Sequence, residues 1–473
     1  MSLASSIARH RRFYIAFTFA AIVLRLLFIL KFPTIAPDSL VYGDIAKNWQ
    51  QGIYGISGVH TPGPAGTPPI RGVEPTDIRM PGYPAFVALC FLLFGSEHYG
   101  AIMYVNLVFD VITCYIIAAL AWRAAGDRAA RIAFALAACC IFFANYVATP
   151  LTEPLAIFAA AAALYFAVRA LSGPVSSPPQ FRSASWVLCG IALASGILLR
   201  PDGGILLGAT LVYLLWRGAR GSLPPKHAMA AALTVAVVAL APLVPWTVRN
   251  WRVLHVFQPL APVYANTPGE FVPLGFIRWQ KTWILDYSSV EDIWFHVPGD
   301  ALDMQALPAR AFDSPTERDE TARLFAEYNH TRVMTGPLDA QFGALAARRI
   351  ARHPLRYYAW LPALRALDLW ARPRTEMLPL DSHWWQFDQD LHDAILGTAI
   401  GLLGWLYLAA ALLALRPGVH VRFGGLLLLF VVLRSAFLAS MPNPEQRYVL
   451  ECFPALLVFA GAGLAGPRPG TQS

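Results

Sequence analysis

Long apolar runs separated by short charged turns dominate the pattern of this 473-residue chain. Runs of about 15 to 23 mostly apolar residues are long enough to cross a bilayer as helices. The pattern predicts about ten such spans, at residues 13–30, 99–122, 129–147, 154–171, 186–199, 203–216, 228–248, 394–415, 423–439 and 449–465. A run at 85–94 is too short to cross and is expected to lie on the membrane surface or dip into it. We therefore predict an all-α polytopic membrane protein.

Composition agrees with this class, because 56% of the residues are hydrophobic and only 14% are charged. Soluble domains usually carry about 25% charged residues. All six cysteines lie in apolar stretches without the spacing of metal ligands, so we predict neither disulfides nor a metal site. The net charge of +8 comes from basic residues spread between the apolar runs, which favours an orientation signal over nucleic-acid binding.

The basic residues alternate with the predicted spans in a way that sets the orientation. If the amino terminus is cytoplasmic, every short inside connection is basic, including those that carry Arg128 and Lys226. The outside connections are then residues 32–98, 148–154, 200–204, 249–393 and 441–448. We therefore predict a multi-pass protein of the inner (plasma) membrane whose active site faces the periplasm.

Three regions follow from this topology. Residues 1–248 are expected to form a membrane core that includes the first periplasmic loop, 32–98, with its interfacial helices. Residues 249–393 are expected to form one small extracytoplasmic lobe with amphipathic helices at 316–329, 338–352 and 355–370. Residues 394–473 are expected to hold the C-terminal transmembrane helices.

The first loop delivers a carboxylate and a guanidinium to one membrane surface. Pro37 and Asp38 begin a predicted helix, with Tyr42 one turn later on the same side. Arg79 stands just before a stiff PGYP turn that contains Tyr83. Two structural interpretations remain open: Asp38 can simply favour the helix dipole, and Arg79 can be an arginine that reaches the headgroups from an interface.

Other outside turns also place ionisable residues at the ends of membrane helices. These residues are Glu153 in LTEP, Arg200 and Asp202 in RPDGG, and Arg447 with Tyr448 in PEQRY. Charged groups at membrane depth are costly and tend to serve a function, although each could also cap a helix or anchor at the headgroups. Arginines can bind a lipid-linked phosphate, and a nearby carboxylate can accept the proton of an acceptor hydroxyl. These are the requirements of glycosyl transfer.

Several segments resemble the membrane-embedded GT-C glycosyltransferases, and most closely the bacterial branch related to protein O-mannosyltransferases and lipid A aminoarabinose transferases. In chain order they are PDSLVYGDIAKNWQQGIYG, RMPGYPAF, LTEP, LLRPDGG, PWTVRNW and EQRYVLECFPAL. The resemblance spans the transmembrane core and is weakest at residues 252–393. It implies a GT-C fold and transfer of a sugar from a polyprenyl-phosphate donor to a hydroxyl of an extracytoplasmic lipid, glycan or protein.

The resemblance also implies roles for individual residues. Asp38 matches the catalytic base, Glu153 takes the place of a second acid, and Arg79 matches a residue that contacts the donor phosphate. Arg200 and the Arg447–Tyr448 pair are similar to further donor-phosphate ligands, and Tyr42, Tyr83 and Asp202 are expected to contact substrate.

One departure from the protein mannosyltransferases is that Asp38 is followed by Ser39 rather than by a second acid, so the acceptor class does not carry over. No metal or cofactor is required by this scheme. The expected partners are the polyprenyl-phosphate sugar, the acceptor and the lipid bilayer, without nucleic acid. The alternatives are a transporter or flippase for a lipid-linked saccharide, and a non-catalytic membrane scaffold.

Overall fold

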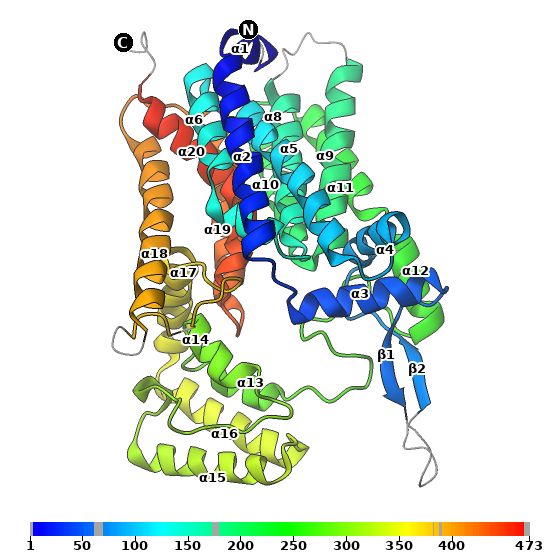
Figure 1. The fold of residues 1–473 in the computed structure, drawn as a ribbon, viewed down its shortest axis with the longest axis vertical. Coiled ribbons are helices and arrows are strands. Elements are labelled where there is room, and N and C mark those ends of the chain that lie inside the picture. The colour runs from blue at the N-terminus through cyan, green and yellow to red at the C-terminus, as the bar shows by residue number, and fades with distance from the viewer. Residues whose placement is uncertain (1–2, 61–69, 173–178, 382, 387–389, 468–473) are drawn as a thin grey trace. The chain divides into compact units, whose positions relative to one another are not determined.

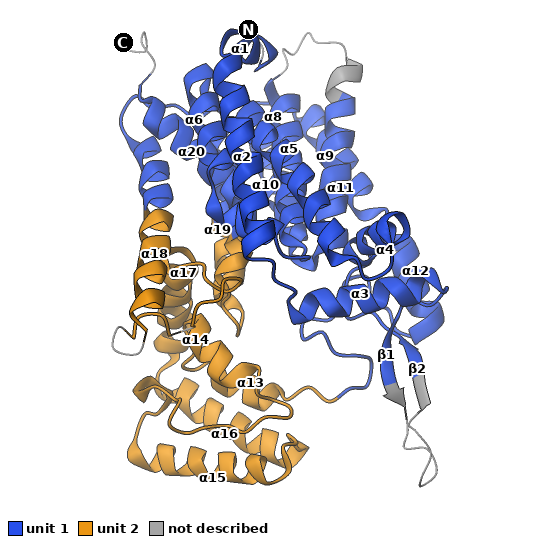
Figure 2. Ribbon diagram, in the orientation of Figure 1, with its two compact units in different colours: residues 1–270, 406–431, 450–473 blue, residues 271–405, 432–449 orange. Residues whose placement is uncertain are grey.

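The computed structural model describes residues 3–60, 70–172, 179–381, 383–386 and 390–467, and these form helices with a single small hairpin among the described residues (Figure 1). The chain divides into two compact units (Figure 2). Unit 1 holds residues 1–270, 406–431 and 450–473, and unit 2 holds residues 271–405 and 432–449. The three regions expected from the sequence were divided by membrane topology and do not coincide with these two units. They stay a prediction.

Unit 1 contains most of the apolar helices, as the hydrophobic runs predict. Up to residue 270 its helices are α1 (Leu3–Arg9), α2 (Arg11–Lys31), α3 (Pro37–Gln50), α4 (Gly82–Phe94), α5 (Tyr99–Ala125), α6 (Asp127–Ala138), α7 (Ile141–Val147), α8 (Glu153–Ser172), α9 (Pro179–Leu199), the 3-10 turn Pro201–Gly203, α10 (Gly204–Ala219), α11 (Pro225–Leu240) and α12 (Leu243–Leu254). The C-terminal helices are α18 (Leu391–Leu412), α19 (Gly424–Ser440) and α20 (Phe453–Ala465), with 3-10 turns at Leu413–Leu415 and Gln446–Cys452. Of these, α20 lies in unit 1, whereas α18 and α19 are each divided between the two units, at residues 405/406 and 431/432.

Six of the described helical segments are long and apolar enough to cross a membrane, or seven if the bent pair α6 and α7 counts as one span. The six are Arg11–Lys31, Tyr99–Ala125, Glu153–Ser172, Pro225–Leu254, Leu391–Leu415 and Gln446–Ala465. The other predicted spans are helical but shorter, so the count of about ten stays a prediction. The all-α multi-pass class is confirmed.

The predicted span 129–147 is broken rather than straight. Its two halves, α6 and α7, meet at an angle of 47°. The break frees carbonyl groups at the end of α6, and Arg25 of α2 donates hydrogen bonds to the carbonyls of Ala137, at 2.9 Å, and Ala138. A buried helix end needs such partners, because its last carbonyls have none within the helix. The sequence of the run gives no proline or glycine at this point that would have signalled the bend.

The first loop folds into α3, an antiparallel hairpin and α4. Strands β1 (Gly55–His60) and β2 (Ile70–Pro75) pair from Gly55 opposite Pro75 to His60 opposite Ile70. The Asp44 carboxylate of α3 accepts hydrogen bonds from the backbone N–H and the hydroxyl of Ser57, which fixes the hairpin to the helix. The hairpin was not predicted, since proline and glycine crowd this loop.

Unit 2 is built from short helices: α13 (Leu274–Gln280), α14 (Tyr287–Ser289), the π-turn Val290–Trp294, the 3-10 turn Ala309–Ala311, α15 (Pro315–Thr331), α16 (Gly336–Arg352), the π-turn Arg356–Trp360 and α17 (Leu361–Ala371). The helices predicted at 316–329, 338–352 and 355–370 are confirmed. Their apolar faces bury an aromatic core around Trp279, Phe325 and Phe342. The starts of α14, α15 and α16 are capped by side chains, such as Ser314, whose hydroxyl accepts from the Glu317 N–H.

Candidate functional site

Asp38 and Arg79, which are 41 residues apart in sequence, form an ion pair in unit 1. Arg79 Nη2 donates to Asp38 Oδ1 at 2.7 Å, and the two side chains are 22% and 35% exposed respectively. Asp38 is the second residue of α3, which begins at Pro37, and Arg79 lies three residues before α4. The Asp38 carboxylate and the Arg79 guanidinium, which were predicted to face one surface, are therefore in contact, and both side chains remain partly exposed.

Tyr42 and Tyr83 form the buried floor beneath this pair. Tyr42 lies one turn after Asp38 on α3, and the Arg79 guanidinium lies 5.7 Å from the centre of its ring. The rings of Tyr42 and Tyr83 meet edge to face at 4.7 Å, and both residues are buried. Burial raises the pKa of Tyr42 to about 12, while nearby Arg79 lowers the pKa and Asp38 raises it. The Tyr42 hydroxyl therefore stays protonated and can donate a hydrogen bond.

Arg200 is the centre of a second cluster, in which one guanidinium faces three carboxylates. Its nitrogens lie 3.2 Å from Glu153 Oε1, 3.1 Å from Asp202 Oδ1 and 3.5 Å from Glu451 Oε1. The side chains are 17% exposed for Arg200 and 4 to 11% for the three acids. Arg200 therefore compensates acids brought from three separate turns of the chain.

Close packing brings the turns that carry the two clusters together. A side chain at Gly82 would meet the backbone carbonyl oxygen of Leu198 at 2.6 Å, so only glycine lets the start of α4 approach the end of α9. Arg200 follows α9 directly, and Arg79 precedes α4. The charges of Arg200 and Glu153 also act on the Tyr42 hydroxyl. The Asp38–Arg79 pair and the Arg200 cluster are thus two parts of one polar site in unit 1.

Glu451 is the member of this site that the sequence reasoning missed. It lies in the EQRYVLECFPAL segment, four residues after Arg447. The signal was present, since Glu451 is an acid just before a strongly apolar helix, as Glu153 is. Its partner Arg200 is 251 residues away, and no local pattern could supply that contact.

Arg447 and Tyr448 belong to unit 2, where they form a local cluster with Glu445. Arg447 Nε lies 2.5 Å from Glu445 Oε2, and the Tyr448 hydroxyl donates to Glu445 Oε1 at 2.8 Å. The Arg447 guanidinium also lies 5.1 Å from the centre of the Tyr448 ring. The turn is therefore held by its own side chains, and its predicted contact with a donor phosphate stays a prediction.

Among the described residues, the cluster Asp390, His392 and Asp393 brings three metal-ligand atoms together. Asp390 and His392 are exposed. The Asp390 carboxylate accepts the N–H groups of His392 and Asp393 in the first turn of α18, and the Asp393 carboxylate accepts the N–H group of Asp381. These hydrogen bonds explain why the side chains converge without a metal ion. In the unit 1 site, Arg200 compensates the three neighbouring acids.

The comparisons with known proteins agree with this architecture. Residues 75–246 match the family described as dolichyl-phosphate-mannose-protein mannosyltransferase, while no curated protein sequence matches the chain. The archaeal oligosaccharyltransferase AglB from Archaeoglobus fulgidus, solved with an inhibitory peptide and a dolichol-phosphate, is similar in structure with a TM-score of 0.50 and 12% identity. That match covers 97% of this chain and 50% of AglB. The chain has a GT-C fold.

ArnT from Cupriavidus metallidurans, solved with undecaprenyl phosphate, is also similar, at 14% identity and a TM-score of 0.42, over 95% of this chain and 77% of ArnT. This chain spans only about half the length of AglB. The resemblance to GT-C proteins is confirmed, and the family match includes Arg79, Glu153 and Arg200. Asp38, Arg447 and Tyr448 lie outside the matched residues.

Proposed function

We propose that this GT-C protein is a glycosyltransferase that moves a sugar from a polyprenyl-phosphate donor to a hydroxyl acceptor on the periplasmic side of the inner membrane. The ion pair between Asp38 and Arg79 carries the proposal. It joins a proton acceptor and a phosphate-binding cation at 2.7 Å, in the loop where the GT-C resemblance expects both. The family match over residues 75–246 and the multi-pass helical fold support the same class of reaction.

In the proposed step the Asp38 carboxylate accepts the proton of the acceptor hydroxyl as that oxygen forms a bond to the anomeric carbon of the sugar. The bond between that carbon and the phosphate oxygen breaks, and polyprenyl phosphate leaves with the electron pair. Because Arg79 already touches Asp38, a phosphate bound by Arg79 would place the anomeric carbon close to the base. The guanidinium would also stabilise the negative charge that grows on the phosphate.

No general acid is needed in this scheme, since a phosphate is a good leaving group. The protonated hydroxyls of Tyr42 and Tyr83 would serve as hydrogen-bond donors to the donor phosphate or the sugar. Burial raises the pKa of Tyr42 to about 12 and keeps this donor available throughout the physiological range.

The resemblance implies that Arg200 binds the donor phosphate, but the acids around it favour a smaller role in phosphate binding. Three carboxylates surround the Arg200 guanidinium, so a phosphate could bind there only if at least one of them turned away or took up a proton. We therefore propose that Arg79 is the first donor-phosphate ligand. Arg200 would hold Glu153 and Asp202 in place and add a contact once substrate has entered. Arg447 and Tyr448 are proposed as further donor ligands on the resemblance alone.

A transfer assay with the purified protein in lipid nanodiscs tests the proposal. A set of polyprenyl-phosphate hexoses and pentoses would be offered with an envelope extract as acceptor, and released polyprenyl phosphate would be measured by mass spectrometry. Release by the wild-type protein and its loss in Asp38→Asn would support the proposal. If the protein moved lipid-linked saccharides across vesicle membranes without releasing polyprenyl phosphate, the transporter alternative would replace it.

A further inference from the structure

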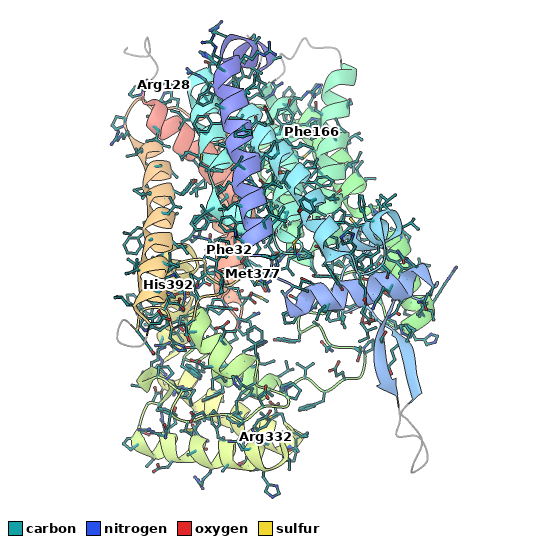
Figure 3. All side chains as sticks on the ribbon, in the orientation of Figure 1. Phe32, Arg128, Phe166, Arg332, Met377 and His392 are labelled. Atoms are coloured by element: carbon teal, nitrogen blue, oxygen red, sulfur yellow. The ribbon has the colours of Figure 1, made fainter. Side chains whose placement is uncertain are left out.

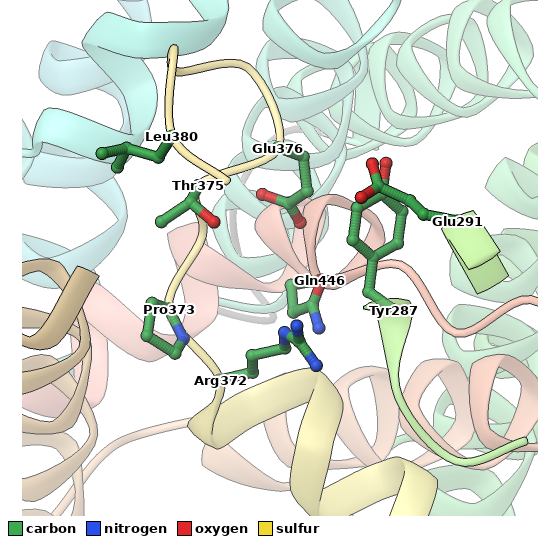
Figure 4. Close-up of a pocket in the computed structure, with 8 residues that line it drawn as sticks. All are labelled: Tyr287, Glu291, Arg372, Pro373, Thr375, Glu376, Leu380 and Gln446. Carbon is green, nitrogen blue, oxygen red and sulfur yellow. The ribbon is translucent and has the colours of Figure 1, made fainter. Parts of the chain in front are cut away.

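A small buried cavity in unit 2 is lined mainly by oxygen-bearing side chains. Its volume is about 30 Å³, enough for an ion with a little water. It is lined by Tyr287, Glu291, Arg372, Pro373, Thr375, Glu376, Leu380 and Gln446 (Figure 4). The lining comes from three separate stretches of the chain, near residues 287–291, 372–380 and 446.

Glu376 presents a buried carboxylate to this cavity. Both of its oxygens are shielded from solvent, and neither has a hydrogen-bond partner among the described residues. None of the ion pairs of the described chain includes Glu376 within 4.0 Å. An ionised carboxylate without partners is very unfavourable in a protein interior, so this group needs either a proton or a cation.

Gln446 supplies another buried oxygen that has no hydrogen-bond partner among the described residues. The residue is fully buried, and its Nε2 donates to Asp368 Oδ2 at 3.0 Å. This hydrogen bond occupies the nitrogen end of the Gln446 amide. Gln446 Oε1 is left without a partner in the described part of the chain, and the side chain lies between those of Glu376 and Arg372 in Figure 4. A buried amide oxygen of this kind is an available ligand.

The cavity wall itself carries two acids and one base. Arg372 is the one basic residue in its lining, and its guanidinium lies 3.9 Å from Asp286 and 4.0 Å from Asp368. Asp286 also pairs with Arg310, and the charges of Arg374 and Arg447 act on Glu376 from outside the lining. Glu291 and Glu376 are the two acids of the cavity wall, and the two unpartnered oxygens of Glu376 face no base of the described chain within ion-pair distance.

We propose that this cavity binds one hard divalent cation, of the Mg²⁺ or Ca²⁺ type, through Glu376, Glu291 and the Gln446 amide oxygen. Carboxylate and amide oxygens are the ligands that such ions prefer, with water completing the coordination. The Thr375 hydroxyl lines the same cavity and offers a further oxygen. One cation can be bound by both Glu376 oxygens and by Gln446 Oε1 at the same time. One proton on Glu376 would leave at least one of these three oxygens without a partner.

The bound ion would join the Tyr287–Glu291 stretch, the loop at 372–380 and the turn that contains Gln446. Arg447 and Tyr448 follow Gln446 directly in that turn. The cation would thus fix the 445–448 turn, and it takes no part in the proposed proton transfer to Asp38. The site does not depend on the proposed function, and its existence can be tested in a protein with no measurable transfer activity.

Cation binding is tested with the full-length protein in detergent, stripped with EDTA and then titrated with MgCl₂ or CaCl₂. Bound metal would be counted by elemental analysis, and the affinity taken from the shift in thermal unfolding. We expect one ion per chain and a higher unfolding temperature. Glu376→Gln should weaken binding by more than about tenfold, because even partners outside the ligand shell contribute that much at metal sites.

Two matched variants keep the test specific. Glu320→Gln removes an exposed acid of unit 2 that pairs with Arg348, and it should leave cation affinity unchanged. His392→Gln disrupts the group of Asp390, His392 and Asp393 and should also leave the cation affinity unchanged. If Glu376→Gln fails to fold, Glu291→Gln replaces it, with the same expected loss. No bound cation, equal affinity in the folded Glu376→Gln or Glu291→Gln protein, or loss of binding in His392→Gln would overturn the proposal.

Discussion

Arg25 of α2 and Asp110 of α5 form a buried ion pair that also completes the end of α6. Arg25 Nε lies 2.7 Å from Asp110 Oδ2, and the side chains are 0% and 3% exposed. The same guanidinium donates to the carbonyls of Ala137 and Ala138 at the break between α6 and α7. One arginine thus links three helices, and Asp110 makes its burial possible.

Replacing one member of this pair should be more damaging than replacing both. We expect Arg25→Met to destabilise the protein by about 3 to 5 kcal/mol, because it leaves the Asp110 carboxylate buried without a partner. The double variant Arg25→Met with Asp110→Leu should recover part of this loss, although the hydrogen bonds from Arg25 to the α6 carbonyls stay lost. Thermal unfolding in detergent measures both. Equal stability of the two variants would show that Asp110 does not depend on Arg25.

Asp38→Asn tests the proposed base. Asparagine keeps the size of the side chain and can still accept a hydrogen bond from Arg79, but it cannot take the proton of the acceptor. We expect turnover to fall by about 10²- to 10⁴-fold with normal folding and donor binding. Asp44→Asn is the matched control, since Asp44 lies on the same helix and contacts Ser57 of the hairpin. Full turnover in a folded Asp38→Asn protein would show that Asp38 is not the base.

Arg79 is expected to bind the donor phosphate through its planar guanidinium. Arg79→Gln should weaken binding of undecaprenyl phosphate by about 1.5 to 3 kcal/mol, the typical value of a hydrogen bond to a charged group. Arg79→Lys should recover only part, because an ammonium group cannot make two parallel hydrogen bonds. Arg217→Gln serves as control, since the Arg217 side chain donates hydrogen bonds to Ser222 and lies over the Phe423 ring, away from Asp38 in the chain. Unchanged binding in Arg79→Gln would return Arg79 to a structural role.

The orientation can be tested by labelling single cysteines. Arg128 and Phe32 lie at opposite ends of the helices of unit 1 in Figure 3, and α3 follows Phe32. Gln51 and Arg128 are both exposed. In a protein whose exposed Cys139 is replaced by serine, an impermeant thiol reagent added from the periplasm should label Gln51→Cys and not Arg128→Cys. The reverse result would place the Asp38 site in the cytoplasm.

Asp368 should make unit 2 less stable as the pH rises. Burial raises the pKa of Asp368 to about 7, even though Arg372 lowers it. The folded chain therefore keeps a proton that the unfolded chain releases. The contribution of this bound proton to the free energy of unfolding is fully present below the ordinary carboxyl pKa of about 4. It is lost as the pH rises through 7. We expect a loss on the order of 1 to 4 kcal/mol between pH 5 and 8.

Asp368→Asn should flatten that pH profile. Because burial also raises the pKa of Glu376 to about 7, the comparison is made in EDTA and in a Glu376→Gln background. Thermal unfolding between pH 5 and 8 gives the profile, and Glu320→Gln is the exposed control. A slope that is the same with aspartate and asparagine at position 368 would show that other groups cause the pH dependence.

The sequence by itself determined the features that depend on neighbouring residues. The apolar runs gave the helices of the membrane core, and the 3.6-residue period gave the helices of unit 2. Pro37 and the PGYP turn gave the starts of α3 and α4, because proline fixes the backbone locally. Asp38 and Arg79 were expected on one surface for the same reason: each is tied to the end of a helix that the pattern identifies.

Only the tertiary structure decided which distant groups meet. At the bend between α6 and α7, the carbonyls of Ala137 and Ala138 accept hydrogen bonds from Arg25, more than 100 residues earlier in the chain. The joining of Glu451 to Arg200 and the convergence of Glu376 with Gln446 also involve residues far apart in the chain. Hydrophobic periodicity records which face of a helix is buried. It carries no information on which helix covers that face, and so the polar contacts inside the fold could be known only from the structure.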